Sequence, residues 1–419
     1  MKIYKNIIVG SGLSGYLVYS KLKKNSLIIT GETKNKVDTK KIHPKIKLIL
    51  GKKTNKIADL IHSKEERVSI FSTASIGGLS NYWGKQFFDY KDNDYWPKKL
   101  FKNFDIYNKS LKIIDKLYSS NKDKIIRKIP INNITINQLS VPILKSNLTR
   151  IDKLNINKIS ERVFFFKKIK KDLIEVRTES NIFYCKHLIL CAGPIGNAMI
   201  LLKSFKNISY LKFKDHNPRV ILGIIRNKKK YLQNKKAKLF DLEINKNDKK
   251  IGFSIIYNID PNHFNKFLKP IITLFRDILK KFFFYGQLWI ADEYNEIKLI
   301  NNKDNIHSYG KTISLKKKKD NLIQILNMIG LKTLACFKLN YGFGYHYHCL
   351  RINFKGKIFS LNDFLKELKL NNNIFCFDSS IIEKIDIKPP TKTYLATTNY
   401  LVEKFLKRFN WLSIVSMLS

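Results

Sequence analysis

The chain has 419 residues, of which 44% are hydrophobic and 12% aromatic, so it can bury a sizeable core and is not a disordered protein. Lys and Arg number 79 against 33 Asp and Glu, which gives a formal net charge of +46. Such a charge would suit a nucleic acid, an anionic membrane or a phosphorylated substrate, but the excess is spread along the whole chain among many Ile and Asn. We therefore favour compositional drift over a dedicated polyanion surface, and expect no specific nucleic-acid partner.

The amino-terminal segment predicts a site for a dinucleotide. A short apolar strand, Lys5 to Val9, leads directly into Gly10-Ser11-Gly12-Leu13-Ser14-Gly15 and then into a helical pattern. In this arrangement Gly10 allows the tight turn, Gly12 lets the backbone approach a pyrophosphate, and Gly15 lets the helix pack on the strand. The start of the helix, at Leu13 and Ser14, would offer free N–H groups to the phosphates.

A second strand, Ser26 to Thr30, ends near Glu32. Glu32 follows Gly10 at about the spacing expected of the acid that accepts a ribose hydroxyl. Strand, glycine motif, helix and acid together predict a dinucleotide site without separating NAD from FAD.

The segment from Gly77 to Gly84 combines a double glycine with two aromatic residues, Tyr82 and Trp83. Adjacent glycines permit close backbone approach to a flat ligand. An ordinary glycine turn before aromatic core residues explains the same letters equally well.

The middle of the chain holds a second strand–turn–helix unit. Leu188 to Leu190 predicts a buried strand, Ala192-Gly193-Pro194 a turn, and the residues to Ser204 a helix whose first turn holds the proline. Two further strands are predicted before it, at Arg162 to Phe166 and Leu173 to Arg177.

Residues 205–340 contain no recognisable motif. Strands are predicted at Val220 to Ile225, Ile251 to Ile259 and Gly286 to Ala291, and a helix over Asn321 to Ala335. The apolar segment Phe267 to Phe284 is broken by five charged residues, so a basic amphipathic core helix is favoured, with a membrane-surface helix as the open alternative. No stretch of about 18 uncharged apolar residues predicts a transmembrane span.

Three features stand near the carboxyl terminus. His346 and His348 lie in a predicted strand, which would point both imidazoles to one side. Asn373 to Ser380 reads as a short strand that ends in Asp378-Ser379-Ser380. Pro389-Pro390-Thr391 then opens a last helix that runs to about Arg408.

Four of these segments, in this order, resemble the glucose–methanol–choline (GMC) oxidoreductases. The resemblance covers residues 1–32, 71–117, 160–204 and 341–405. It implies FAD as the cofactor, and the Tyr at position 82, where some relatives carry a flavin-linked His, implies that the FAD is not covalently bound. It also implies that the amino terminus of the last helix, helped by Lys392, stabilises the reduced flavin. The candidate cofactor-binding residues are Gly10, Gly12, Leu13, Ser14, Gly15, Glu32, Gly77, Gly78, Ser80, Asn81, Trp83, Ala192, Gly193, Asp378, Ser379, Pro390 and Thr391.

The family's chemistry is hydride transfer from an alcohol to the flavin, with a His as the base that takes the hydroxyl proton. His346 is the candidate base and His348 the second candidate. The Gly-Thr that follows the family's base is missing, and Pro389 stands where a second His or Asn is usual. Three interpretations stay open: one His works alone or with Asn81, His348 replaces the lost partner, or the alcohol chemistry has been lost. The two histidines and Cys349 could hold a metal, but no third ligand cluster is evident in the sequence, so we expect none.

The expected fold is α/β, with a Rossmann-like FAD domain around a parallel sheet and a substrate domain with an antiparallel sheet and helices. The FAD domain is predicted to take residues 1–120, 150–204 and 341–419, and the substrate domain residues 205–340 with parts of 121–149. The expected activity is oxidation of an alcohol or sugar hydroxyl with an unknown electron acceptor, and whether the substrate is anionic stays open. The alternatives are a flavoprotein of other chemistry, or a basic membrane- or nucleic-acid-binding protein on an inactive FAD scaffold. The five cysteines form no CxxC pair, which favours a cytoplasmic protein; association with the inner, anionic membrane surface stays open.

Overall fold

The structure is a computed structural model. It describes residues 2–23, 25–31, 61–63, 68, 70, 72, 76–81, 86–118, 124–140, 157–226, 241–247, 249–258, 261, 267–302, 305–313, 316–342 and 344–418.

The first sheet is built around parallel strands. Its order is β6-β2-β1-β9-β8-β7, and β20 pairs with β9 beside this path. β1, β2, β6, β9 and β20 are parallel, whereas β7, β8 and β9 form an antiparallel meander. The strands are β1 (Ile3–Val9), β2 (Ser26–Thr30), β6 (Lys158–Ser160), β7 (Val163–Lys170), β8 (Leu173–Thr178), β9 (Ile182–Leu190) and β20 (Ile374–Cys376).

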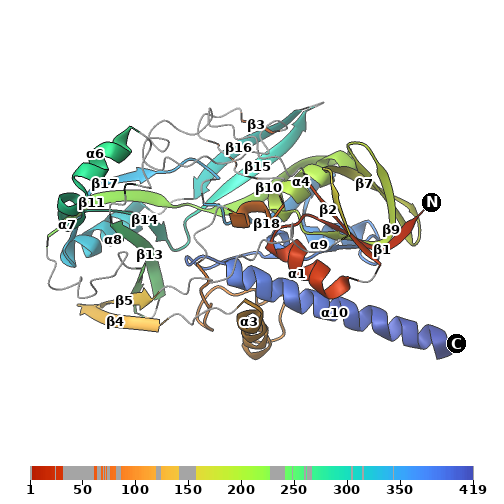
Figure 1. Cartoon of the computed structure of the whole chain (residues 1–419), viewed down its shortest axis with the longest axis horizontal. Helices are drawn as coiled ribbons and strands as arrows, with labels where there is room; N and C mark the ends of the chain where they lie inside the picture. The colour runs from red at the N-terminus through yellow and green to blue at the C-terminus, as the bar shows by residue number, and fades with distance from the viewer. Residues whose placement is uncertain are drawn as a thin grey trace.

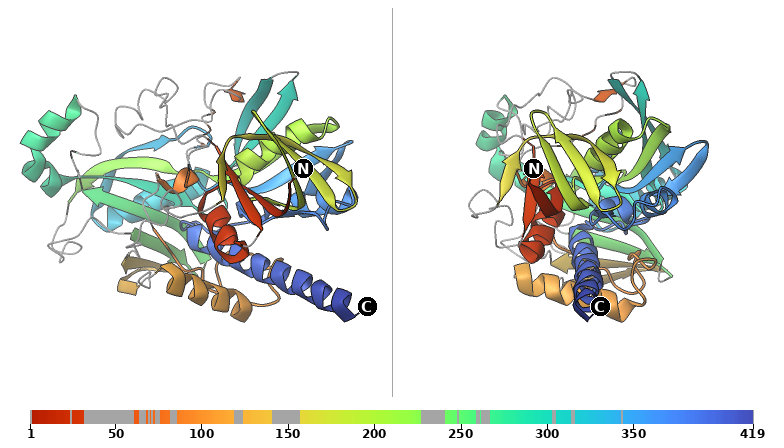
Figure 2. Two further views of the ribbon diagram at one scale, coloured as in Figure 1. Left: turned by 45° about the vertical axis from the view of Figure 1, so that its right-hand side comes forward. Right: turned by 90° about the vertical axis from the view of Figure 1, so that its right-hand side faces the viewer.

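Both faces of this sheet are covered, because alternate residues of its strands enter different hydrophobic clusters. Ile7 and Val9 of β1 pack with α4 (Gly193–Ser204), whereas Ile8 packs with α1 (Leu13–Leu22) and α10 (Thr391–Leu418). α10 also packs on α3 (Phe104–Tyr118), and Figure 1 shows α1 and α3 on its two sides. Figure 2 shows α10 running out from the centre of the molecule to the carboxyl terminus.

The described residues form two further sheets. The second has the order β19-β18-β10-β15-β16-β3 and is antiparallel except for the parallel pair β16–β3. Its strands are β3 (Ile61–Ser63), β10 (Ile208–His216), β15 (Tyr294–Asn302), β16 (Asn305–Ile313), β18 (His348–Phe354) and β19 (Lys357–Ser360), followed by α9 (Leu361–Glu367).

The third sheet is antiparallel, in the order β17-β11-β14-β13-β12-β5-β4. Apolar residues of α8 (Lys316–Met328) pack against it in one cluster. The strands are β4 (Lys124–Ile131), β5 (Ile134–Ser140), β11 (Arg219–Ile225), β12 (Asp241–Lys246), β13 (Lys249–Asn258), β14 (Phe283–Ile290) and β17 (Leu331–Lys338).

The expected fold class is therefore confirmed. The domain limits stay a prediction: the third sheet takes its strands from 124–140 and 219–338, but β10, β15 and β16 of the same region join β18 in the second sheet.

Two elements differ from the prediction. The helix expected over Asn321 to Ala335 runs from Lys316 to Met328, because Gly330 adopts a φ of +85° and the chain turns into β17. The core helix expected within Phe267 to Phe284 is instead two short helices, α6 (Leu268–Leu274) and α7 (Arg276–Phe282), whose side chains are mostly exposed. Among the described residues, no helix is long and apolar enough to cross a membrane.

Candidate active site

The carboxyl ends of three parallel strands bring distant motifs to one edge of the first sheet. Val9 of β1 and Cys376 of β20 both pair with Leu190 of β9. The glycine motif, the Ala192-Gly193 turn and Asp378 come directly after these three strand ends. In open α/β sheets this edge is where ligands bind.

The glycines of the loop between β1 and α1 differ in what surrounds them: two are needed for close packing, and one leaves space for a ligand. Gly10 has a φ of +99°, and a Cβ there would lie 2.5 Å from the carbonyl oxygen of Cys191. A Cβ on Gly15 would lie 1.9 Å from the carbonyl oxygen of Gly10. By contrast, a Cβ on Gly12 would meet no atom within 4 Å, and no side chain caps the start of α1 at this residue. The residues present therefore fit a phosphate group at Gly12 and the first turn of α1.

The double glycine lies against the same loop. A Cβ on Gly78 would be 3.4 Å from the Cα of Gly12. The amide of Gly77 donates to Ser11 Oγ at 3.3 Å, and Ser11 Oγ lies 2.5 Å from Thr30 Oγ1. Gly77 and Gly78 (the latter opening the 3₁₀ turn η1, Gly78–Asn81) thus meet the glycine motif, as a shared cofactor site requires.

Asp378 joins two of the predicted segments to each other. One carboxylate oxygen accepts from the Gly193 amide at 2.7 Å and from Asn197 Nδ2 at 2.9 Å. The other accepts from the Ser380 amide at 2.9 Å, which caps the 3₁₀ turn η4 (Ser379–Ile381). The Gly193 amide at the start of α4 is thus taken by Asp378, whereas no side-chain cap bonds to the start of α1.

The start of α10 is tied to the same region. Thr398 Oγ1 donates to Ser14 Oγ at 3.0 Å, and Pro390 is buried just before Thr391 opens the helix. The side chain of Lys392 is fully buried, and its ammonium pairs with Asp115 at 2.6 Å and with Asp89. Its charge is therefore neutralised beside α3, which corrects the expectation that Lys392 assists a reduced flavin.

Of the remaining predicted cofactor-binding residues, some lie in the described part of the chain and others outside it. Leu13 and Ala192 lie at the starts of α1 and α4, and Ser379 is buried in η4. Ser80 donates to the Gly77 carbonyl at 2.5 Å. Glu32 and Trp83, with Tyr82 and the side chain of Asn81, lie outside the described residues.

A pair of histidines forms the centre of the polar site. His346 Nδ1 lies 2.7 Å from Nδ1 of His216, which ends β10, and the two rings meet edge to face. The hydroxyl of Tyr394, in the first turn of α10, donates to the carbonyl of His346 at 3.2 Å. His346 precedes β18 rather than lying in a strand, because Tyr345 has a φ of +57°. The expectation that a strand points both imidazoles to one side is therefore wrong.

The backbone carbonyl of Asp386 fixes the tautomers of this pair. It lies 2.7 Å from His216 Nε2, and because a carbonyl only accepts, Nε2 carries the hydrogen. In neutral His216, Nδ1 is then an acceptor, so Nδ1 of His346 must donate to it. The free lone pair of neutral His346 is consequently on Nε2. His348 donates from Nδ1 to the His346 carbonyl at 2.9 Å.

Burial keeps the cluster uncharged. It lowers the pKa of His216 to about 4 and that of His348 to about 3, and with its histidine neighbours it lowers the pKa of His346 well below the usual value. Asp215 accepts from the amides of Gly344 at 2.7 Å and His346 at 2.9 Å. Burial raises the pKa of Asp215 to about 7 although these amides lower it. Asp215 thus holds the backbone that carries His346.

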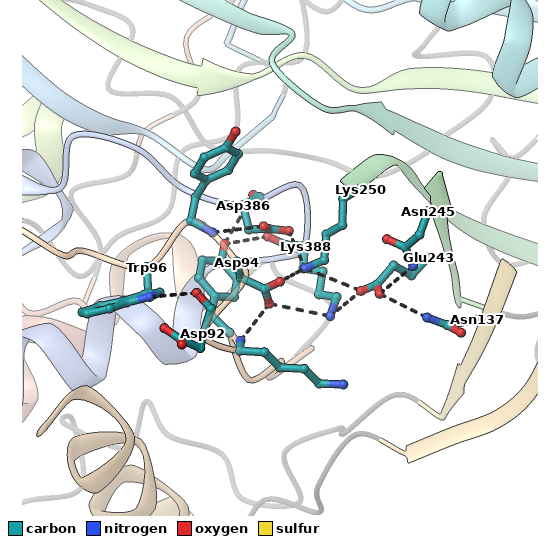
Figure 3. Close-up of polar contacts among 12 residues, drawn as sticks. Asp92, Asp94, Trp96, Asn137, Glu243, Asn245, Lys250, Asp386 and Lys388 are labelled. Atoms are coloured by element: carbon teal, nitrogen blue, oxygen red, sulfur yellow. Dashed lines mark hydrogen bonds and ion pairs between the residues drawn. The ribbon is translucent and has the colours of Figure 1, made fainter. Parts of the chain in front are cut away.

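A buried ionic cluster holds the loop that ends in α10 (Figure 3). Lys250 of β13 pairs with Asp386 at 3.1 Å and with Asp94, and Lys388 pairs with Glu243 of β12 at 2.5 Å. Burial would lower the pKa of Lys388, but the carboxylates of Glu243 and Asp94 raise it above its usual range. The cluster therefore anchors the carbonyl of Asp386 to the third sheet.

Sequence reasoning missed His216 and Asp215. The available signal was Asp-His-Asn-Pro directly after a strand, with His216 among only 8 histidines in the chain. Among the described residues, no group of three His, Cys, Asp or Glu side chains could hold a metal ion.

No protein-family model and no curated protein matches the sequence. Among solved structures, the chain is similar to pyridoxine 4-oxidase from Mesorbium loti, with a TM-score of 0.50 and 11% identity over 96% of this chain and 99% of that one. It is also similar to a formate oxidase variant from Aspergillus oryzae RIB40, studied for modification of its FAD, with a TM-score of 0.50 and 10% identity over 98% and 100% of the two chains. At these identities the similarity shows a shared fold.

Proposed function

We propose that this protein is an FAD-dependent oxidoreductase that oxidises an alcohol or sugar hydroxyl to a carbonyl, with the FAD bound non-covalently. The observation that carries the proposal is the His216–His346 pair beside the first turn of α10, in a fold shared with two solved oxidases. A cytoplasmic location belongs to the same proposal, and an anionic sugar would suit the net charge of +46.

The cofactor would be held at the carboxyl edge of the first sheet. The open face of Gly12 and the uncapped start of α1 suit its pyrophosphate, and Gly77 and Gly78 lie beside them. When bound, FAD supplies the acceptor for the hydride that leaves the substrate carbon.

His346 is the proposed base. Its Nε2 lone pair takes the hydroxyl proton, which leaves an imidazolium whose Nδ1–H bond to His216 becomes charge-assisted. His216 can stay an acceptor throughout, because the Asp386 carbonyl keeps its own hydrogen on Nε2. His216 therefore acts as a positioning residue, in the manner of the acid that orients a catalytic histidine. His216 thus gives His346 a hydrogen-bond partner, which Pro389, standing where a second His or Asn is usual, does not provide.

The test is anaerobic reduction of the protein's flavin by a panel of alcohols and sugars, some phosphorylated. Bleaching by at least one of them is expected, together with a loss of about 10²-fold or more in His346→Gln and a much smaller loss in His348→Gln. Equal losses in the two variants would contradict the assignment of the base. Bleaching by none of the panel, with flavin bound, would favour a flavoprotein of other chemistry or an inactive scaffold.

A further inference from the structure

The helices α6 and α7 expose an unusual number of large apolar side chains. Ile271 is 56% exposed, Leu274 78%, Phe275 47% and Ile278 58%. Ile272 alone of the residues in the two helices whose side chains are described is buried. Large apolar side chains exposed together on two contacting helices mark an interaction site rather than ordinary surface.

This surface stands at one end of the molecule. Figure 1 shows α6 and α7 at the end opposite both termini, and the left view of Figure 2 shows α6 projecting beyond the third sheet. α7 contacts α6 and the neighbouring strands β11 and β14, so the third sheet supports the pair of helices. The exposed apolar residues can therefore bind another surface without disturbing the core.

The charges around the apolar residues indicate which kind of partner this surface binds. Lys269, Arg276 and Lys281 are exposed on the same two helices, and Asp277 is the only acidic residue between 267 and 284. Cations beside exposed Phe, Leu and Ile are the composition of helices that lie in the interface of an anionic bilayer. Acidic headgroups attract such cations, while the apolar side chains enter the acyl boundary.

We propose that α6 and α7 form a membrane-docking surface that binds the protein peripherally to bilayers containing anionic lipids. Figure 1 shows the active-site elements α1, β18 and the start of α10 away from this end, so docking leaves them outside the bilayer. The proposal does not depend on the flavin chemistry, and either can fail without the other.

The test is co-sedimentation of the full chain with vesicles of phosphatidylcholine alone and of phosphatidylcholine mixed with phosphatidylglycerol. Binding to the mixed vesicles is expected, with a loss of about tenfold or more in the partition coefficient of Leu274→Gln/Ile278→Gln. Neutralising Lys269, Arg276 and Lys281 to Gln should cost up to about fivefold for each cation at low salt.

A matched control separates this surface from the overall charge. Leu117→Gln/Ile358→Gln changes the same residue types at other exposed positions, 53% and 59% exposed on α3 and β19, and should bind as the parent does. Equal binding by the Leu274/Ile278 variant, the control and the parent would mean that the net charge of +46 alone adsorbs the protein, and would overturn the proposal. An absence of vesicle binding would also overturn the proposal. If sedimentation velocity then showed a dimer that the Leu274/Ile278 variant abolishes, the partner of this surface would be a second copy of the chain.

Discussion

Replacing His216 tests the tautomer argument directly. His216→Leu keeps an apolar side chain of moderate size but removes both ring hydrogen bonds, at 2.7 Å to His346 and 2.7 Å to the Asp386 carbonyl. The bond to His346 carries charge once that ring is protonated, and hydrogen bonds to charged groups contribute about 1.5–3 kcal/mol. Because 1.36 kcal/mol corresponds to a factor of ten, the flavin-reduction rate should fall by about 10- to 150-fold.

The assay is anaerobic stopped-flow reduction of the flavin across pH, with His216→Gln as the matched variant. A Gln amide can accept from His346 and donate to Asp386, so it should recover most of the lost rate. In the parent, the lowered pKa of His346 keeps its Nε2 unprotonated below neutral pH, so a fall in rate between pH 7 and pH 6 would follow the protonation of Asp215, whose pKa is raised to about 7. A His216→Leu protein that stays folded, keeps its flavin and shows the parent's rate and pH profile would refute the reasoning.

Three further predictions concern the framework of the site. Gly10→Ala should lower the free energy of unfolding by about 2–4 kcal/mol, because its Cβ would lie 2.5 Å from a carbonyl oxygen. Gly12→Ala should change the free energy of unfolding by less than about 1 kcal/mol and still lose bound flavin. Chemical denaturation measures the first effect and flavin content the second. Lys250→Met should destabilise the fold by about 3–5 kcal/mol, measured by urea denaturation, because it leaves the carboxylates of Asp94 and Asp386 buried with one cation fewer; a change within about 0.5 kcal/mol would contradict the role of the cluster. Burial lowers the pKa of His187 to about 4, so between pH 6.5 and pH 4 the unfolded chain binds a proton there that the folded protein does not, and stability falls as the pH drops. His187→Phe should remove up to about 3 kcal/mol of that fall. An unchanged dependence of the free energy of unfolding on pH in this variant would contradict the prediction.

The parts of the fold that follow from local rules were predictable. The strand from Ile3 to Val9, the turn at Gly10 and the start of α1 each follow from neighbouring residues alone, because apolar runs, glycine conformations and helix starts are local. The same holds for the turn at Gly193, which has a φ of +71°.

The parts that depend on distant pairing were not predictable. His216 reaches His346 because β10 pairs with β18, with Lys214 opposite His348, and one sequence does not specify that register. The helical pattern of Phe267 to Phe284 was visible, but helical spacing does not say which residues another element covers. The helix expected to continue to Ala335 ends earlier because a glycine with positive φ outweighs the apolar spacing beyond it.

The most direct test of the central claim is the visible absorption spectrum of the purified full chain, before and after acid precipitation. We expect flavin bands that move into the supernatant and are identified there as FAD, and a colourless protein for Gly12→Ala. Flavin that stays with the precipitate would contradict non-covalent binding. A colourless parent protein that also takes up no added FAD would contradict the proposed function itself.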